Sequence, residues 1–188
     1  MSRLPVFITG NSGKAAFLSK WLGAELEHEE LDLVEPQSMD IKEIASIKAK
    51  QAYDQIRKPV LVEDASLGFE SLGGLPGPFI KWFLERLSLQ EICDLLKSYD
   101  NKSALHEVCY CYFDGTEPRF FIGKQPGRIA DHPSGKGGFG FDPIFTPFDA
   151  TVTYADMDDE QLAKHALRTS KIFPELKAYL LDPNHASP

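Results

Sequence analysis

Pro59-Val60-Leu61-Val62-Glu63-Asp64 is a run of apolar residues that ends in two adjacent carboxylates. An uninterrupted apolar run is typical of a central strand covered on both faces. Ligands of α/β proteins gather at the carboxyl ends of such strands, and carboxylate oxygens suit Mg²⁺. Adjacent strand residues point to opposite faces, so Glu63 and Asp64 reach one ion only if the strand turns there. Otherwise one binds metal while the other orients water, or the pair belongs to an ordinary turn.

Strand-like and helix-like segments alternate before this run. The predicted strands cover Leu4 to Thr9 and Glu25 to Leu33, and the predicted helices cover Lys14 to Leu22 and Ile41 to Ile56. The helices show apolar residues at helical spacing, and the second strand alternates leucine with acids. This alternation predicts an α/β class.

Antiparallel signals follow in the middle of the chain. After a glycine- and proline-rich turn, helices are expected over Phe79 to Leu87 and Leu89 to Tyr99. The β-branched and aromatic stretches Ala104 to Phe113 and Pro118 to Gly123 flank Asp114-Gly115-Thr116, which is a hairpin signal. The sheet should therefore be mixed.

The chain is expected to be a single domain over 1–188 with an inserted lobe at about 66–121. A final helix from Asp159 to Leu181 is expected, interrupted or kinked at Pro174. Residues 182–188 are expected to form a loose tail.

Composition excludes several functional classes. The hydrophobic fraction of 43% and the charged fraction of 26% are those of an ordinary globular protein. A net charge of -8 argues against a nucleic-acid binder, although local lysines and a metal can still bind a small anion. The three cysteines fit neither a zinc pattern nor a disulfide framework. No targeting signal or membrane span is expected, so the predicted location is cytoplasmic.

A candidate phosphate cradle lies at the first strand-to-helix turn, Thr9-Gly10-Asn11-Ser12-Gly13-Lys14. Free backbone N–H groups at a helix start, with a lysine in the first turn, attract phosphate. The spacing differs from that of a Walker A loop. An ordinary N-cap turn with a solvated lysine remains the alternative.

Two further groups of residues extend the candidate site. Glu35 lies where a third carboxylate could bind the same metal ion. Lys48 interrupts the apolar face of a predicted helix, so it is a second candidate. The alternative for Lys48 is a lysine whose stem is buried while its ammonium reaches solvent. The glycine-rich stretch 135–143 lets the backbone approach a ligand. Phe139 or Phe141 could stack on a base there and Asp142 could accept its hydrogen bonds, although a mobile loop would look the same.

Four segments in this order resemble the inosine triphosphate pyrophosphatase family. They are Thr9-Gly10-Asn11 with Lys14, Glu63-Asp64, Leu72 to Phe83, and Gly138 to Pro143. The resemblance runs from about Val6 to Tyr179. It implies an elongated α/β fold with two lobes, a nucleotide cleft between them, and a homodimer. It also implies hydrolysis of ITP, dITP and XTP to the monophosphate and pyrophosphate.

The resemblance also implies roles for individual residues. Thr9, Asn11 and Lys14 would hold the triphosphate, and Lys48 and Lys81 would add positive charge there. Glu35 and Asp64 would hold Mg²⁺ with Glu63 beside them, and Asp64 would accept the proton of the attacking water. A second group of residues would contact the base: Phe139, Gly140, Phe141, Asp142 and His165.

The last helix departs from the family's pattern E-K-x-x-x-S-H-R. Aligned on His165, the lysine, serine and arginine of that pattern become Glu160, Lys164 and Ala166. Lys164 or Arg168 could compensate, since Arg168 follows His165 by three residues on a continuous helix. Ala65 also replaces the Ser or Thr that usually follows the acidic pair.

Three functions are therefore compared. The first is the pyrophosphatase, with base selectivity that is relaxed or redirected because charged contacts to the base are lost. The second is a nucleotide-binding protein that has lost catalysis. The third is a pyrophosphatase for modified pyrimidines, which would share the phosphate chemistry. Neither the preferred base nor the choice between Mg²⁺ and Mn²⁺ follows from the sequence.

Overall fold

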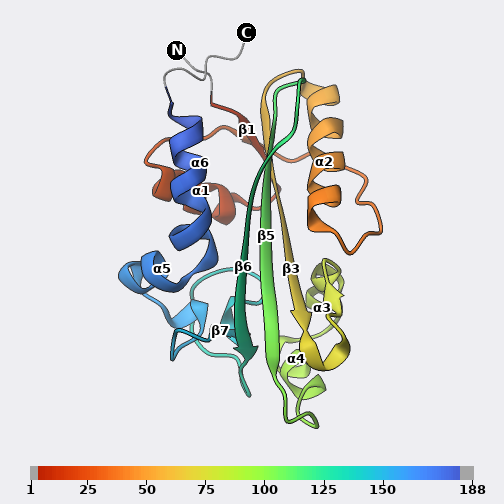
Figure 1. The fold of residues 1–188 in the computed structure, drawn as a ribbon, viewed down its shortest axis with the longest axis vertical. Coiled ribbons are helices and arrows are strands. Elements are labelled where there is room, and N and C mark those ends of the chain that lie inside the picture. The colour runs from red at the N-terminus through yellow and green to blue at the C-terminus, as the bar shows by residue number, and fades with distance from the viewer. Residues whose placement is uncertain (1–3, 183–188) are drawn as a thin grey trace. The chain divides into compact units, whose positions relative to one another are not determined.

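The computed structural model describes residues 4–182, so all but the first residue of the expected tail at 182–188 lies outside the described residues. A mixed sheet runs through the described chain (Figure 1). Its strands are β1 Val6–Ile8, β2 His28–Glu29, β3 Val60–Phe69, β4 Pro76–Gly77, β5 Ser103–Phe113, β6 Arg119–Ile129 and β7 Phe145–Pro147. The α-helices of the described chain are α1 Ser12–Leu22, α2 Ile41–Ile56, α3 Ile80–Arg86, α4 Leu89–Leu95, α5 Asp159–His165 and α6 Phe173–Leu180.

The order of the strands confirms the α/β class with a mixed sheet. The sheet has seven strands in the order β2-β1-β3-β5-β6-β7, with β4 paired to β3. β1 is parallel to both β2 and β3, whereas β4 and β7 are antiparallel to their partners. The parallel strands are linked through helices, as parallel pairing requires.

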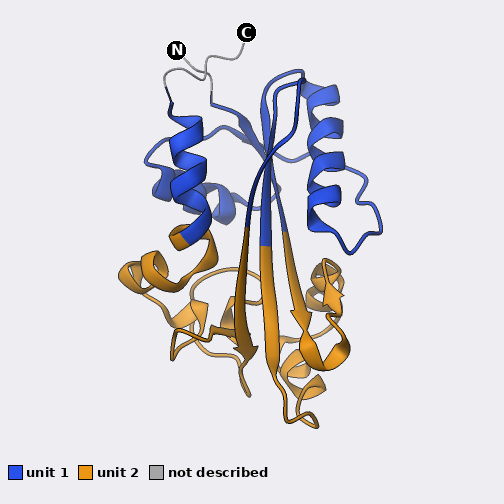
Figure 2. Cartoon of the chain, viewed as in Figure 1, with its two compact units in different colours: residues 1–64, 108–122, 171–188 blue, residues 65–107, 123–170 orange. Residues whose placement is uncertain are grey.

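The described chain divides into two compact units (Figure 2). Unit 1 takes the residues up to Asp64, Val108–Ile122, and those from Lys171 on, and unit 2 takes Ala65–Glu107 and Gly123–Ser170. This division differs from the expected lobe at about 66–121 because β5 and β6 each contribute residues to both units. The turn of their hairpin therefore belongs to unit 1.

Unit 1 has a sheet with helices on both faces, α1 and α6 on one side and α2 on the other (Figure 1). The strand residues that face α2 include Val60, Val62 and Cys109, which pack with Ala45 and Ala49 of the helix. The opposite face carries rings, among them Phe7 and Tyr110 of the sheet and Phe173 of α6. Side chains of β3 thus alternate between an α2 face and an α1/α6 face, as strand geometry requires.

Unit 2 has its own aromatic core. Buried side chains from β3, α4 and β7 form it, including Phe69, Ile92 and Phe145. His106 of β5 is fully buried, and the rings of Phe141, Phe145 and Tyr154 pack against it within 5.8 Å.

The central strand is longer than the apolar run indicated. β3 continues through Glu63 and Asp64 to Phe69, so the prediction that the acid pair ends the strand is wrong. β3 has partners from other parts of the chain: β5 is its neighbour in the sheet, and β4 pairs with its second half, with Leu67 opposite Gly77. The two acids lie in mid-strand and consequently point to opposite faces.

The last helical region also differs from the prediction. α5 ends at His165, and Ala166 adopts an extended conformation with φ -81° and ψ 134°. Helical structure resumes as a π-turn over Arg168–Ile172 and continues as α6. The chain therefore leaves regular α-helix at two places: at Ala166, where the helix is interrupted, and in the π-turn that directly precedes α6, of which Pro174 is the second residue.

No helix between residues 4 and 182 is both long enough and apolar enough to cross a membrane. All three cysteines lie in the described part of the chain and are buried and free.

Candidate active site

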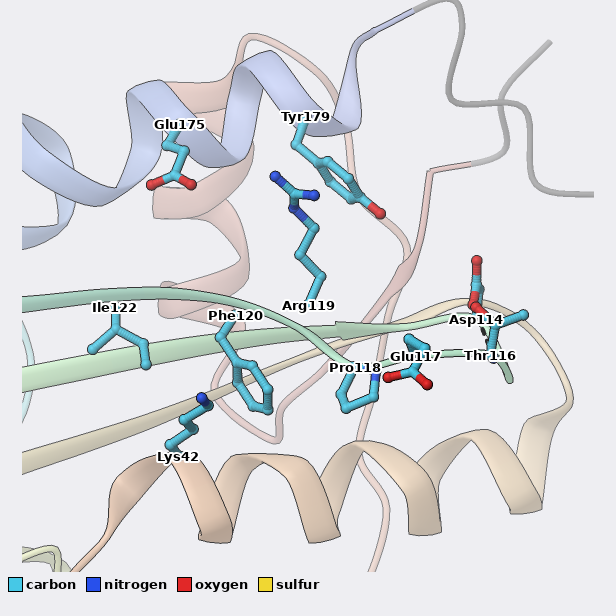
Figure 3. A pocket seen from close by; sticks show the side chains of 10 residues that line it. All are labelled: Lys42, Asp114, Thr116, Glu117, Pro118, Arg119, Phe120, Ile122, Glu175 and Tyr179. Atoms are coloured by element: carbon cyan, nitrogen blue, oxygen red, sulfur yellow. Dashed lines mark hydrogen bonds between the residues drawn. The ribbon is translucent and has the colours of Figure 1, made fainter.

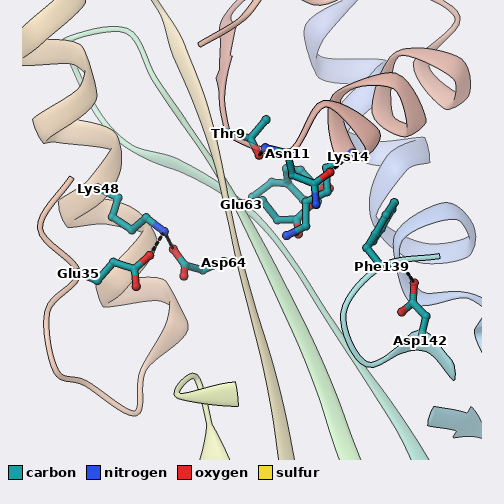
Figure 4. A network of polar contacts seen from close by, with 10 residues as sticks. Thr9, Asn11, Lys14, Glu35, Lys48, Glu63, Asp64, Phe139 and Asp142 are labelled. Atoms are coloured by element: carbon teal, nitrogen blue, oxygen red, sulfur yellow. Dashed lines mark hydrogen bonds and ion pairs between the residues drawn. The ribbon is translucent and has the colours of Figure 1, made fainter. Parts of the chain in front are cut away.

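The two acids of β3 serve different faces of unit 1 (Figure 4). Asp64 points to the α2 face, where it meets Lys48 of α2. Glu63 points to the other face, where it meets Lys14 of α1. Each acid is thus paired with a lysine from the helix that covers its own face of the sheet.

Lys48 joins two carboxylates. Its Nζ atom lies 3.1 Å from Glu35 Oε1 and 3.2 Å from Asp64 Oδ2. Burial pulls the pKa of Lys48 down, but the charges of Asp64 and Glu35 outweigh it, and the pKa is raised above its ordinary value. Lys48 is therefore a buried cation that two anions hold, and the alternative of an ammonium that reaches solvent does not describe it.

The carboxylate of Asp64 is largely shielded from water. Its side chain is 15% exposed, and burial raises its pKa to about 6 although Lys48 opposes the shift. Within the described chain, Asp64 Oδ2 is buried and has no hydrogen-bond partner apart from the ion pair to Lys48. A carboxylate with a raised pKa is a good proton acceptor near neutral pH.

The residues on the α2 face fit a magnesium ion in number and kind. No cluster of three or more His, Cys, Asp or Glu side chains suited to a metal occurs among residues 4–182. Mg²⁺ does not need one, because it commonly takes one or two carboxylates and completes its shell with water and substrate phosphates. Glu35 and the buried Oδ2 atom of Asp64 supply such a pair. The structure does not bring Glu63, the third predicted ligand, to this pair.

Glu63 belongs to a separate network on the α1 face. Its side chain is 3% exposed, and its Oε1 atom lies 3.0 Å from Lys14 Nζ. Its other oxygen, Oε2, accepts a hydrogen bond from the hydroxyl of Tyr110. Both oxygens of Glu63 are therefore engaged within unit 1.

The predicted phosphate cradle forms the start of α1. Asn11 is the N-cap, and its Oδ1 atom accepts a hydrogen bond of 3.1 Å from the backbone N–H of Lys14. The N–H of Asn11 in turn donates to Thr9 Oγ1 at 3.1 Å. The first turn of α1 holds no acidic residue, so nothing on the helix itself neutralises the positive end of its dipole. This is the arrangement that binds anions at helix starts.

The glycine-rich stretch of unit 2 is ordered around Asp142. Its Oδ2 atom accepts a hydrogen bond of 2.8 Å from the N–H of Phe139, and its side chain is buried. Gly138 has φ +74°, and a Cβ atom there would lie 2.2 Å from Asp142 Oδ2. Gly140 has φ +63°. These glycines are needed for close packing and for left-handed backbone, so the mobile-loop alternative does not fit.

The two phenylalanines of this stretch have different surroundings. Phe141 is buried in the core of unit 2 with its ring edge-on to His106. Phe139 instead carries the guanidinium of Arg168 over its ring, 5.7 Å from the centroid. Of the two rings that were candidates for stacking, only Phe139 lies outside that core.

His165 and Lys81 lie elsewhere on unit 2. The Nδ1 atom of His165 lies 3.2 Å from Asp149 Oδ2, and Gln125 donates to the other oxygen of Asp149 at 3.3 Å. Lys81 is on the exposed side of α3, and its Nζ atom lies 5.8 Å from the ring centroid of Trp82. The break at Ala166 separates His165 from Arg168, so the expectation that they share one helix face is wrong.

Sequence reasoning missed two positioning groups. Tyr110 contacts Glu63 across 47 residues of chain, and Asp149 contacts His165 across 16 residues. Tyr110 lies between two cysteines in the apolar strand β5. The alternation of side chains along the strand is the only sequence signal for the face of the sheet to which Tyr110 points.

A surface groove of about 730 Å³ lies in another part of unit 1 (Figure 3). Its lining comes from α2, α6 and the β5–β6 hairpin and includes none of the predicted site residues. The cations in its lining already contact rings, Lys42 that of Phe120 at 4.7 Å and Arg119 that of Tyr179 at 4.5 Å. The groove therefore takes no part in the candidate site.

The chain is similar to known proteins over most of its length. The model of the Ham1 family matches residues 5–172. The chain is 40% identical to inosine triphosphate pyrophosphatase 2 of Trypanosoma cruzi over 176 residues, 92% of this chain and 89% of that protein. It is 40% identical to the inosine triphosphate pyrophosphatase of Saccharomyces cerevisiae over 190 residues, 93% of this chain and 94% of that protein.

A solved structure shows the same fold. The HAM1 protein from Coxiella burnetii matches with a TM-score of 0.76 at 26% identity, covering 93% of this chain and 96% of that chain. The fold, the match over most of the chain and the close relatives confirm the resemblance seen in the sequence. This chain belongs to the Ham1 family.

Proposed function

We propose that this chain is a nucleoside triphosphate pyrophosphatase that acts on deaminated purine nucleotides such as ITP, dITP and XTP. Two relatives at 40% identity are named inosine triphosphate pyrophosphatases. The observation that carries the proposal is the cluster of Asp64, Lys48 and Glu35. It holds a buried carboxylate of raised pKa beside a cation, which a hydrolase needs and a simple binder does not.

Asp64 is the proposed proton acceptor. The oxygen of a water molecule attacks the α-phosphorus, Asp64 takes the proton of that water, and the bond to the bridging oxygen breaks. Pyrophosphate and the nucleoside monophosphate result. Lys48 stabilises the negative charge that develops on the phosphate oxygens. Mg²⁺ bound by Glu35 and Asp64 would supply further stabilisation of this charge and is the proposed cofactor.

The start of α1 is the proposed binding site for the remaining phosphates. Thr9, Asn11 and Lys14 lie there, joined by the hydrogen bonds of the turn, and Lys14 brings a cation paired with Glu63. Lys81 of α3 is proposed to add a second cation for the phosphates. The absence of acids from the first turn of α1 supports this assignment.

The base is proposed to contact residues of unit 2. Phe139 offers a ring, and Asp142 with Gly140 fixes the backbone around it. Phe141 supports this segment from the core, and His165 is oriented by Asp149. Arg168 over Phe139 brings a cation to the same segment.

Pyrophosphate release is the decisive measurement. With Mg²⁺ present, the wild-type chain should convert ITP to IMP and pyrophosphate. Asp64→Asn should lower kcat by about a hundredfold or more, as expected when a general base is lost. Asp54→Asn is the matched control, because Asp54 is an exposed residue of α2 paired only with Arg57 among described ion pairs. Nucleotide binding without pyrophosphate release in the wild type would favour the binding protein instead.

The physiological setting is part of the proposal. We propose a cytoplasmic homodimer. Three buried free cysteines support a reducing compartment. Sedimentation equilibrium should give twice the mass of 21.0 kDa, and a monomer at micromolar concentration would contradict the dimer.

A further inference from the structure

Glu63 carries a buried charge that the proposed chemistry does not use. Its side chain is 3% exposed, and burial of a carboxylate is costly unless hydrogen bonds and a counter-ion compensate it. Both compensations are present, since Lys14 pairs with Oε1 and the Tyr110 hydroxyl donates to Oε2. The partners come from α1 and β5, on the face of the sheet opposite Asp64.

Tyr110 is itself held rigidly. Its side chain is 1% exposed in the middle of β5. Its ring lies 6.2 Å from that of Phe7 on the sheet and 5.8 Å from that of Phe173 on α6. A ring packed in this way cannot swing, so its hydroxyl defines the position of Glu63 Oε2.

Lys14 is the most exposed member of the network. Lysine has a flexible stem of four methylene groups, and its side chain here is 28% exposed. Its ammonium has three N–H donors, and Glu63 accepts one of them at 3.0 Å. The backbone N–H of Lys14 is fixed by Asn11 at 3.1 Å. The residue is thus anchored at both ends, with donors left for an anion at the start of α1.

We propose that Glu63 is a positioning residue for Lys14 and that the Tyr110 hydroxyl fixes Glu63 in this role. This inference rests on the proposed phosphate-binding role of Lys14. We propose this role for Glu63 in place of metal binding, because both oxygens of Glu63 are engaged on the face of β3 opposite Asp64. The ammonium is held where phosphate oxygens arrive, so less rotamer freedom is lost on binding.

The first test is Tyr110→Phe in the full chain, which removes only the hydroxyl. Binding of inorganic tripolyphosphate is measured by calorimetry without divalent metal, which isolates Lys14 from the Glu35 and Asp64 pair. The affinity should fall on the order of fivefold, since a hydrogen bond to a carboxylate is lost. KM for ITP with Mg²⁺ should rise to a similar extent while kcat stays within about twofold of wild type.

The matched control is Tyr112→Phe. Tyr112 lies two residues along β5, so it faces the same side, and its ring packs on Tyr179. This variant should leave both the tripolyphosphate affinity and KM unchanged. Equal effects of the two variants would show a general loss of packing and would overturn the inference.

A double-mutant cycle with Lys14→Met shows whether Tyr110 acts through Lys14. In the Lys14→Met background, Tyr110→Phe should have no further effect on tripolyphosphate affinity. Additive effects would overturn the inference. Tighter binding of tripolyphosphate by Tyr110→Phe or Glu63→Gln would also overturn the inference, because it would show that Glu63 competes with phosphate for Lys14.

The outcomes separate this inference from the proposed function. If the wild type releases no pyrophosphate yet binds tripolyphosphate in a Tyr110-dependent way, the pyrophosphatase proposal fails and the positioning role stands. If ITP is hydrolysed but the cycle is additive, only the positioning role fails. Thermal unfolding of each variant identifies any that fail to fold, and Tyr110→Phe still decides the matter if Glu63→Gln does not fold.

Discussion

Glu63 and Asp64 are neighbours in the chain, yet each carboxylate faces a lysine from a different helix. The separation follows from the alternation of side chains along β3, which continues past both residues. Asp64 is compensated incompletely and keeps a raised pKa, whereas Glu63 is compensated on both oxygens. Asp64, which has fewer hydrogen bonds and ion pairs than Glu63, is therefore the residue suited to proton transfer.

Asp64 gives a pH dependence of stability in the metal-free protein. Burial raises its pKa to about 6 from an ordinary value of 3.8. Between these values the folded state binds more protons than the unfolded state, so stability falls as pH rises. In EDTA, this group should lower the free energy of unfolding by roughly 2 to 3 kcal/mol between about pH 4 and pH 7.

Urea denaturation of wild type and Asp64→Asn measures this contribution. The variant cannot titrate at this position, so it should gain stability relative to wild type as the pH rises. Parallel pH profiles of the two proteins would contradict the assigned burial of the charge.

At the scale of elements, α1 combines a structural cap with a proposed binding role. Asn11 caps the helix through the N–H of Lys14, and the cap leaves the other amides of the first turn directed outward. Capping and phosphate binding therefore depend on the same turn.

Replacing the cap separates the two roles. Asn11→Ala should cost about 1 kcal/mol of stability. It should also raise KM for ITP, because Asn11 contacts the phosphates in the proposed site. Ser88→Ala, which removes the capping box of α4, is the control. It should cost a similar free energy and leave KM unchanged, and an equal rise of KM in both variants would argue against a binding role for Asn11.

The place of Pro174 gives a second prediction for an element. Proline inside a helix costs about 3 kcal/mol, but in the first turn it costs little. Because Pro174 lies in the first turn of α6, Pro174→Ala should change stability by less than about 1 kcal/mol. Thermal denaturation checks this value. A gain near 3 kcal/mol would mean that the helix runs unbroken through this position.

At the scale of the whole molecule, most of the proposed phosphate-binding residues and the proposed base contacts belong to different compact units. The acids, Lys14, Lys48 and the helix start proposed for the phosphate chemistry lie in unit 1, and Lys81 alone of the proposed phosphate-binding residues lies in unit 2. The ring of Phe139, His165 and the departures from the family's last-helix pattern lie in unit 2. Changes to the base contacts therefore leave the reacting groups untouched.

This division predicts retained hydrolysis with relaxed choice of base. Glu160 and Ala166 remove positive charge from the family's pattern, and Arg168 returns one cation beside Phe139. We expect kcat/KM for ITP, XTP and GTP to lie within about tenfold of one another. Arg168→Met should alter these ratios more than it alters kcat for any one substrate. A preference for ITP over GTP of a thousandfold would contradict relaxed selectivity.

Local sequence patterns were enough to predict the α/β class, the helix α2 and the end of α1 at Leu22, whereas α1 starts at Ser12, two residues before the predicted Lys14. Ile41–Ile56 was predicted to the residue because its apolar spacing and its end before Pro59 are local properties. The motif around Asn11 and the acid pair Glu63-Asp64 could be found in the sequence because they too are local patterns. Local patterns also carried the resemblance to the family, which the comparisons confirmed.

Which groups meet depends on the packing of the whole fold. Whether β3 stops or continues at Asp64 depends on its pairing with β4 and β5, which no residue within β3 specifies. Tyr110 reaches Glu63 from 47 residues away, and Lys48 joins Glu35 to Asp64 from a neighbouring helix. These contacts arise from the packing of helices on the two faces of one sheet. Sequence spacing fixes the face to which a side chain points, and packing fixes its partner.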